Sequence, residues 1–193
     1  MPLTLNRASV AEMLKSETYE HHTSSEALIG PLLASIRDND DYVALLHIFY
    51  GFFQPVEELI AAQISNPVLP DIHERRNAKI ILEDLASLGK HEPPVICHSL
   101  PAINDLPAAL GALYVLEGST LGGRVIRKML LKHPSLSLDE SKLKFFNGYG
   151  DATGEKWKAF QQCINRYDHQ SEEIITAARD TFSKFSNWIR TRS

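Results

Sequence analysis

The chain has 193 residues, of which 44% are hydrophobic, and this length and composition suit one domain, residues 1–193, with ample core. A net charge of −4 and a pI near 6.1 argue against a general nucleic-acid-binding protein. No apolar run approaches a membrane span, the start lacks a signal-peptide core, and Cys97 and Cys163 form no CxxC, so we expect a reduced cytoplasmic protein without a membrane partner.

Apolar residues recur along the chain at helical spacing, and no stretch alternates with the period of two that a half-buried strand requires. The sequence therefore predicts an all-α fold. Between residues 91 and 104 three prolines predict a connector without a helix. The expected helices cover residues 9–28, 41–64, 72–88 and 106–131, a short piece at 139–146, and 155–190 as two helices or one bent helix.

The first expected helix carries a histidine, a carboxylate and an ammonium group on one face. Lys15, His22 and Glu26 are spaced by seven and four residues, and Gly30-Pro31 is expected to end the helix. A neutral imidazole can bind iron, a carboxylate four residues on can orient its ring, and an ammonium can hold an anionic group of the same ligand. The alternative is an ordinary pair on a helix surface. His21 points about 100° away around the helix and has no carboxylate four residues on.

The second expected helix contains Pro55, which predicts a kink, and His47, which lies among apolar residues. A histidine in such a setting is expected to be a hydrogen-bonded core residue rather than a metal ligand.

The helix expected at residues 106–131 is interrupted by glycines at four positions: Gly111, Gly118, Gly122 and Gly123. Each glycine inside a helix costs about 1 kcal/mol relative to alanine, so bare backbone must serve a purpose there. In one interpretation, Gly118 and Gly122 let a neighbouring helix pack closely. In the other, the helix bends at the glycines, lays its backbone on a flat ligand and exposes freed N–H and C=O groups.

These two helices together resemble heme oxygenases. The proximal signature of that family, a Lys, six residues and His-Thr-x-x-Glu, stands here as Lys15 followed by HTSSE at residues 22–26. The distal signature, a glycine-bearing kinked helix, stands as LEGSTLGG at residues 116–123. Residues 45–60 and 157–165 also resemble the family's second and late helices, so the resemblance spans most of the chain.

The resemblance implies a helical bundle that holds heme b, as substrate and cofactor, between a proximal and a kinked distal helix. It implies iron ligation by His22, with Glu26 orienting the ring. O2 and electrons from a reductase or a ferredoxin would convert the heme to biliverdin, carbon monoxide and ferrous iron. The biliverdin could pass to a phytochrome. The residues that the resemblance assigns to the distal wall are Gly118, Ser119, Gly122 and Gly123, and those that it assigns to heme binding are Lys15, His22, Glu26, Tyr114 and Lys158.

The resemblance has one departure and leaves one rival function open. Mammalian-type members carry an Asp after the first distal glycine, where this chain has Ser119, as bacterial biliverdin-producing members do. Lys15 and Tyr114 match the spacing of residues that fix the heme propionates in relatives that cleave the α meso carbon, so we expect α cleavage. The rival is a non-catalytic protein that binds or transfers heme through the same His22 pocket. Thiaminase-II-like and di-iron folds are disfavoured, because neither cysteine has a recognisable setting and no paired E-x-x-H motif is present.

Overall fold

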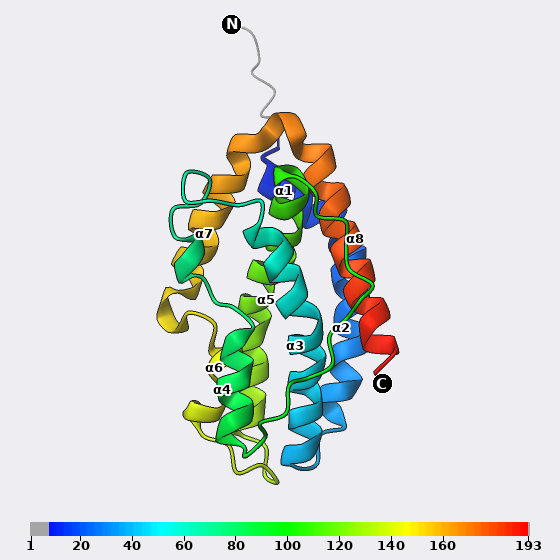
Figure 1. The fold of residues 1–193 in the computed structure, drawn as a ribbon, viewed down its shortest axis with the longest axis vertical. Helices are drawn as coiled ribbons and strands as arrows, with labels where there is room; N and C mark the ends of the chain where they lie inside the picture. Colours follow the sequence, from blue (N-terminus) through cyan, green and yellow to red (C-terminus); the bar gives the residue numbers. More distant parts are fainter. Residues whose placement is uncertain (1–7, 193) are drawn as a thin grey trace, which may run out of the picture.

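The computed structural model describes residues 8–192, and every regular element in that range is a helix, which confirms the all-α prediction (Figure 1). The α-helices are α1 (Val10–Glu17), α2 (Tyr19–Ala34), α3 (Asn39–Ala61), α4 (Lys79–Ser87), α5 (Leu106–Leu131), α6 (Lys144–Asn147), α7 (Thr153–Ile164) and α8 (Ser171–Arg190). Short 3-10 helices lie at Ile72–Glu74 (η1), Glu140–Lys142 (η2), Gly150–Ala152 (η3) and Asn165–Gln170 (η4).

The long helix α5 runs through the middle of the bundle and has the predicted bounds (Figure 1). Its start is fixed by Asp105, whose side chain accepts a hydrogen bond from the Ala108 N–H, and by Pro107, whose missing N–H has no partner to lose there. Its most extensive contacts are with α8. A Cβ on Gly111 would lie 2.3 Å from the Ile174 carbonyl oxygen, so a glycine is what lets α5 and α8 cross this closely.

The first expected helix is in fact two helices. They are separated at Thr18, whose φ of −106° and ψ of 3° are not helical and whose hydroxyl donates to the Leu14 carbonyl at 2.7 Å. The periodic apolar pattern runs on across Thr18 without a glycine or proline, so the sequence carries no sign of the break. Lys15 therefore lies on α1, while His22 and Glu26 lie on α2.

Helix α2 also continues past the point where Gly30-Pro31 was expected to end it. Its last turn follows Pro31, and the Ser35 N–H bonds the Pro31 carbonyl at 2.9 Å. Leu32 and Leu33 in that turn pack against the core, and their burial outweighs the hydrogen bond that the proline cannot make.

The other expected elements are present, but the third helix and the short piece expected at 139–146 are each divided in two, the latter into η2 and α6. The segment 72–88 forms the short η1 and the helix α4 rather than one helix, with an extended residue at Arg75 between them. Residues 91–104 carry no helix, and the 155–190 segment is divided into α7 and α8 by η4, where Tyr167 departs from helical geometry.

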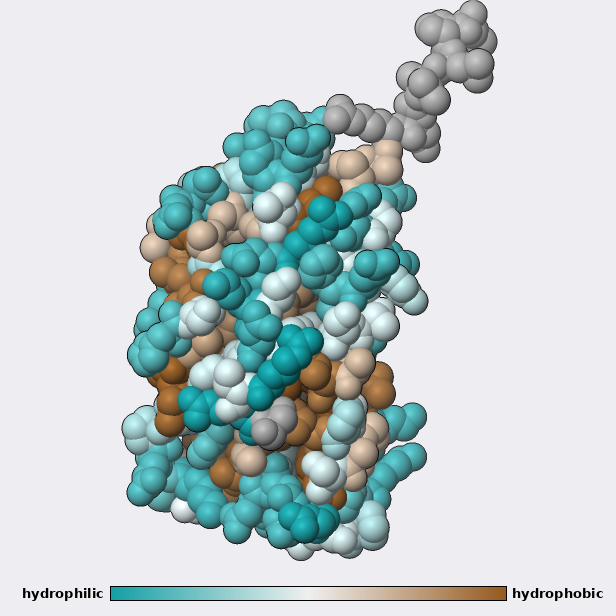
Figure 2. Space-filling view, turned by 90° about the vertical axis from the view of Figure 1, so that its right-hand side faces the viewer, coloured by the Kyte–Doolittle hydropathy of each residue, from teal (hydrophilic) through white to brown (hydrophobic). Residues whose placement is uncertain are grey.

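The expectation that no apolar segment approaches the length of a membrane span is wrong for helix α3. Asn39–Ala61 is long and apolar enough by length and composition, but 61% of its most apolar window is buried inside the fold. Pro55 lies within this helix without ending it. On the face shown in Figure 2, hydrophobic surface appears in gaps between hydrophilic side chains rather than as one uninterrupted patch. The buried apolar residues of α3 therefore belong to the core of the bundle.

Candidate functional site

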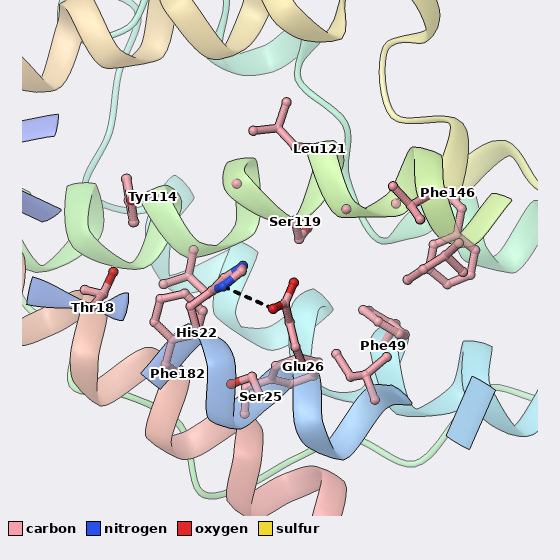
Figure 3. A pocket seen from close by; sticks show the side chains of 18 of the residues that line it. Thr18, His22, Ser25, Glu26, Phe49, Tyr114, Ser119, Leu121, Phe146 and Phe182 are labelled. Carbon is pink, nitrogen blue, oxygen red and sulfur yellow. Dashed lines mark ion pairs between the residues drawn. The ribbon is translucent and has the colours of Figure 1, made fainter. Parts of the chain in front are cut away.

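A cavity of about 710 Å³ lies between α2 and α5 (Figure 3). Its volume falls in the range of pockets that bury a small organic ligand. Phenylalanine rings from α3, α6 and α8 make up much of its wall. These rings belong to Phe49, Phe53, Phe145, Phe146, Phe182 and Phe185.

On the α2 side, His22 and Glu26 face the cavity together. Nδ1 of His22 lies 3.6 Å from Oε2 of Glu26, and the imidazole packs edge-on against Phe182 with ring centroids 5.9 Å apart. With Nδ1 turned toward the carboxylate, Nε2 is left to bind a metal. The His22 side chain is 54% exposed, so a ligand in the cavity can reach it.

Helix α2 is held in place behind these residues by a buried hydrogen bond. The hydroxyls of Ser25 and Ser186 lie 2.9 Å apart and join α2 to α8, and the Ser25 hydroxyl also donates to the His21 carbonyl. The face of α2 that carries His22 is therefore fixed relative to the rest of the bundle.

Two other histidines, on α2 and α3, do not line the cavity. His21 and His47 are not among the described residues that line the cavity. The prediction that His47 is hydrogen-bonded is wrong for one atom, because its buried Nε2 finds no partner within residues 8–192. Burial lowers the pKa of His47, with the nearby charge of Lys90 adding to the effect, so the uncharged ring is favoured there.

On the α5 side, Gly118 and Gly122 leave space rather than allow a helix to pack. A Cβ on Gly122 would meet nothing within 4 Å, and one on Gly118 would meet Trp157 only at 3.8 Å, an ordinary contact. The interpretation that these two glycines permit close helix packing is therefore wrong. It holds instead for Gly123, whose Cβ would lie 3.1 Å from the Phe146 carbonyl oxygen.

Helix α5 is unbroken through this glycine cluster. Residues 106–131 form a single α-helix, so the glycines do not end it or divide it. The helix is packed along its length by α3, α6, α7 and α8, and this packing holds a glycine-rich segment helical despite its low propensity.

Lys15 and Tyr114 both line the cavity. Thr18 is a hydrogen-bond partner of the Tyr114 hydroxyl, and the Tyr114 ring lies 5.4 Å from that of Trp157. Burial raises the pKa of Tyr114, which keeps the hydroxyl protonated and able to donate.

Lys158 does not join them. Trp157 and Gln161, four residues apart on α7, line the cavity, and Lys158 is not among the described lining residues. One residue along a helix turns the side chain by about 100°, and Lys158 is exposed. Its predicted contact with the ligand is not supported by this placement.

Ser119 is paired with a buried cation that the sequence did not reveal. Its hydroxyl donates to the Leu116 carbonyl at 2.6 Å and accepts a hydrogen bond from Nη2 of Arg76 at 2.9 Å. The Arg76 guanidinium also lies 4.3 Å from the Phe145 ring centroid and lines the cavity. Burial lowers the pKa of Arg76, and the negative charges of Glu117 and Glu57 oppose that shift.

Behind Ser119, Glu117 anchors α5 through two hydrogen bonds. Its Oε2 accepts from Nη1 of Arg75 at 2.5 Å, and its Oε1 accepts from the Tyr149 hydroxyl at 2.7 Å. That hydroxyl in turn accepts from the backbone N–H of Arg76 at 3.0 Å. The glycine segment is thus tied to residues that lie before α4 and after α6.

Sequence spacing could not find this network, because its partners are 42 and 32 residues apart. The one available signal was Glu117 itself. A carboxylate between apolar residues in a helix that is buried on most sides needs a partner, and adjacent arginines at residues 75 and 76 could supply it.

Comparisons with known proteins agree with this geometry. A family model described as heme oxygenase matches residues 8–191. A heme oxygenase of Xanthomonas campestris pv. campestris is 32% identical over 152 residues, which cover 77% of this chain and 88% of that relative. Heme oxygenase PigA of Pseudomonas aeruginosa is 26% identical over 195 residues, 96% of each chain. The solved NO- and CO-bound heme oxygenase of Neisseria meningitidis has the same fold, with a TM-score of 0.78, 22% identity, and coverage of 95% of this chain and 92% of that one.

Proposed function

The chain belongs to the heme oxygenase family and degrades heme oxidatively, and we propose that it does so in the cavity between α2 and α5. The substrate, heme b, is cleaved at a meso carbon to biliverdin, carbon monoxide and ferrous iron. In this proposal O2 is the oxidant and a separate protein, a reductase or a ferredoxin, supplies the electrons.

The residues present fit a heme. The cavity is lined by aromatic rings, one imidazole among its described lining residues lies on the α2 side, and on the α5 side a Cβ at Gly122 would stand in open space. A macrocycle that brings its own iron needs only such a single protein ligand and close backbone on the opposite face. This juxtaposition of His22 with the glycine segment across the cavity is the observation that carries the proposal (Figure 3).

His22 would hold the iron through Nε2. Glu26, whose Oε2 lies 3.6 Å from Nδ1, would orient the ring from the side away from the iron. A neutral imidazole donates less electron density than a thiolate, which disfavours early O–O cleavage.

The opposite wall would shape the space for oxygen. Gly118 and Gly122 present no side chain, so the backbone of α5 can lie against the substrate. Ser119 stands beside them with its hydroxyl held between the Leu116 carbonyl and Arg76. A hydroxyl and a buried guanidinium would thus bind ordered water where mammalian-type relatives use a carboxylate.

The cavity rim would set which meso carbon is attacked. Lys15 and Tyr114 can donate charge-assisted hydrogen bonds to the anionic propionates and so fix the in-plane rotation of the ring. We propose cleavage at the α carbon on this basis, with biliverdin then available to an acceptor such as a phytochrome. Free, buried Cys97 and Cys163 suit a reducing cytoplasm.

The purified chain with hemin provides the test. Hemin should give a Soret band typical of histidine ligation, and ascorbate under air should convert it to biliverdin with one carbon monoxide released per heme. A protein that forms the Soret band but leaves the heme intact under these conditions would be a heme-binding protein and not the proposed enzyme.

A further inference from the structure

A cationic groove lies on α5 beside the cavity. The groove has a volume of about 520 Å³ and is lined by Arg124, Val125, Arg127, Lys128, Leu131 and Lys132. Four cations within nine residues contrast with a net charge of −4 for the chain. The groove is therefore a positively charged region on a protein whose net charge is negative.

The charge available to a partner is concentrated in two lysines. Arg127 is paired with Glu140 at 2.6 Å, and Arg124 lies 3.9 Å from Asp151. Lys128 and Lys132, four residues apart on one face of the helix, are exposed and have no ion pair among residues 8–192. They remain uncompensated in the described structure.

The groove adjoins the mouth of the heme cavity. Val125 lines both, and together with Leu121 and Met129 it forms an apolar stripe at i, i+4 and i+8 along the cavity side of α5. These three side chains are 42%, 64% and 47% exposed in the order Leu121, Val125 and Met129. None of the four cations is among the described residues lining the cavity, so the substrate does not use them.

We propose that this groove docks the acidic face of a small one-electron donor protein of the ferredoxin type. The proposal rests on the function proposed above. Each encounter passes one electron from the donor's reduced iron–sulfur centre, which is oxidised, to the heme, which is reduced. A partner seated here lies next to the cavity, because Val125 lines both.

The observations favour an acidic protein over other anionic partners. Two uncompensated lysines beside an apolar stripe match a small, charge-steered protein contact, in which complementary charge raises the association rate. Anionic membranes are recognised by clusters of four to eight basic residues, and here two of the four already lie beside carboxylates. The acidic balance of the whole chain opposes nucleic acid.

The test compares two sources of electrons for the heme-loaded enzyme. Turnover is measured first with ascorbate, and then with an acidic plant-type [2Fe–2S] ferredoxin kept reduced by NADPH and its reductase, at several salt concentrations. Lys128→Glu/Lys132→Glu should raise the KM for ferredoxin at least tenfold at low salt and flatten its salt dependence. The ascorbate-driven rate and the Soret titration should stay within twofold of wild type.

Two controls separate local charge from other effects. Lys128→Arg/Lys132→Arg keeps both charges and should behave as wild type, and Lys79→Glu, an exposed lysine of α4, should leave the KM for ferredoxin unchanged. An unchanged KM in the double charge reversal overturns the proposal. So does a reversal that abolishes sedimentation with phosphatidylglycerol vesicles while donor kinetics stay intact, since the groove would then serve a membrane. Failure of the wild type to degrade heme with ascorbate would instead refute the proposed function, and the docking site with it.

Discussion

Nη1 of Arg75 lies 2.5 Å from Oε2 of Glu117, and this buried ion pair fixes the segment before α4 to the residue that directly precedes Gly118. Both side chains are almost fully buried, at 2% and 4% exposure. Burial alone would lower the pKa of Arg75, but the adjacent carboxylates of Glu117 and Asp71 outweigh it and raise that pKa. The pair thus places the glycine wall at a defined distance from the rest of the bundle.

Removing the carboxylate of this pair should destabilise the protein strongly. Glu117→Ala leaves Arg75 charged and buried without its closest partner, a change that typically costs about 3–5 kcal/mol of unfolding free energy. Urea denaturation measures the loss. The matched control is Glu83→Ala, which removes an exposed pair with Lys144 and should cost less than about 1 kcal/mol. Equal losses in the two variants would show that the buried pair has no special role.

Loss of the imidazole of His22 should remove the histidine-ligated heme spectrum and abolish turnover. His22→Ala deletes the one imidazole among the described cavity-lining residues, while His21→Ala and His47→Ala leave the cavity wall unchanged. Absorption spectra of the hemin complexes and bilin yield compare the three variants. A wild-type spectrum in His22→Ala would exclude this residue as the iron ligand.

The glycines of α5 should respond to substitution in opposite ways. Gly111→Ala brings a methyl group to 2.3 Å from the Ile174 carbonyl oxygen and should destabilise by about 1–3 kcal/mol through overpacking. Gly122→Ala meets open space and should leave stability unchanged or raise it by up to about 1 kcal/mol.

Catalytic activity, unlike stability, should be sensitive to a larger side chain at Gly122. Gly122→Leu should fill the cavity over the porphyrin and reduce oxygen reactivity much more than stability, as measured by thermal denaturation beside bilin formation. If Gly122→Ala instead cost several kcal/mol, the space that the structure shows at this residue would be wrong.

The rim residues should control the product isomer. Wild type should yield α-biliverdin, and Lys15→Asn/Tyr114→Phe should yield a mixture that includes β or δ isomers, because the propionates lose both anchors. Chromatography of the extracted pigments identifies the isomers. A wild-type product dominated by β or δ biliverdin would contradict the assignment.

Glu57 should make stability depend on pH. Burial raises the pKa of its carboxyl to about 7, with Glu117 adding to the shift, while the Ala78 N–H and the charges of Arg76 and Lys79 oppose it. In the unfolded chain the same carboxyl has its ordinary pKa of 4.5, so the native state binds the extra proton between pH 4.5 and 7. The favourable contribution is complete below pH 4.5 and is lost as pH rises through 7.

Glu57→Gln should therefore be more stable than wild type at pH 8, by at most about 3 kcal/mol, and should show little difference near pH 4. Urea denaturation across this range measures the effect. Glu58→Gln, an exposed neighbour on α3, serves as the control and should run parallel to wild type. Parallel curves for Glu57→Gln as well would show that Glu57 is an ordinary carboxylate.

The sequence predicted those parts of the site that depend on local pattern. Helix α5 was correct to the residue because Pro107 and the apolar period mark its start and course, and Lys15, His22, Glu26 and Tyr114 do meet at one cavity. The break at Thr18 was missed because no glycine or proline marks it, and the extension past Pro31 was missed because the packing of Leu32 and Leu33 decides it. Arg76 and its contact with Ser119, 43 residues away, depend on the fold alone.

The division between α1 and α2 separates the residue that would bind the iron from the residue that would fix the rotation of the heme ring. The iron ligand stands on α2, which Ser25 ties to α8, whereas the rim cation Lys15 stands on α1 beyond Thr18. A substitution that changes the angle at Thr18 would re-aim the lysine and leave the axial ligand where it is. Relatives with this joint could thus diverge in the isomer they release while keeping the same iron chemistry.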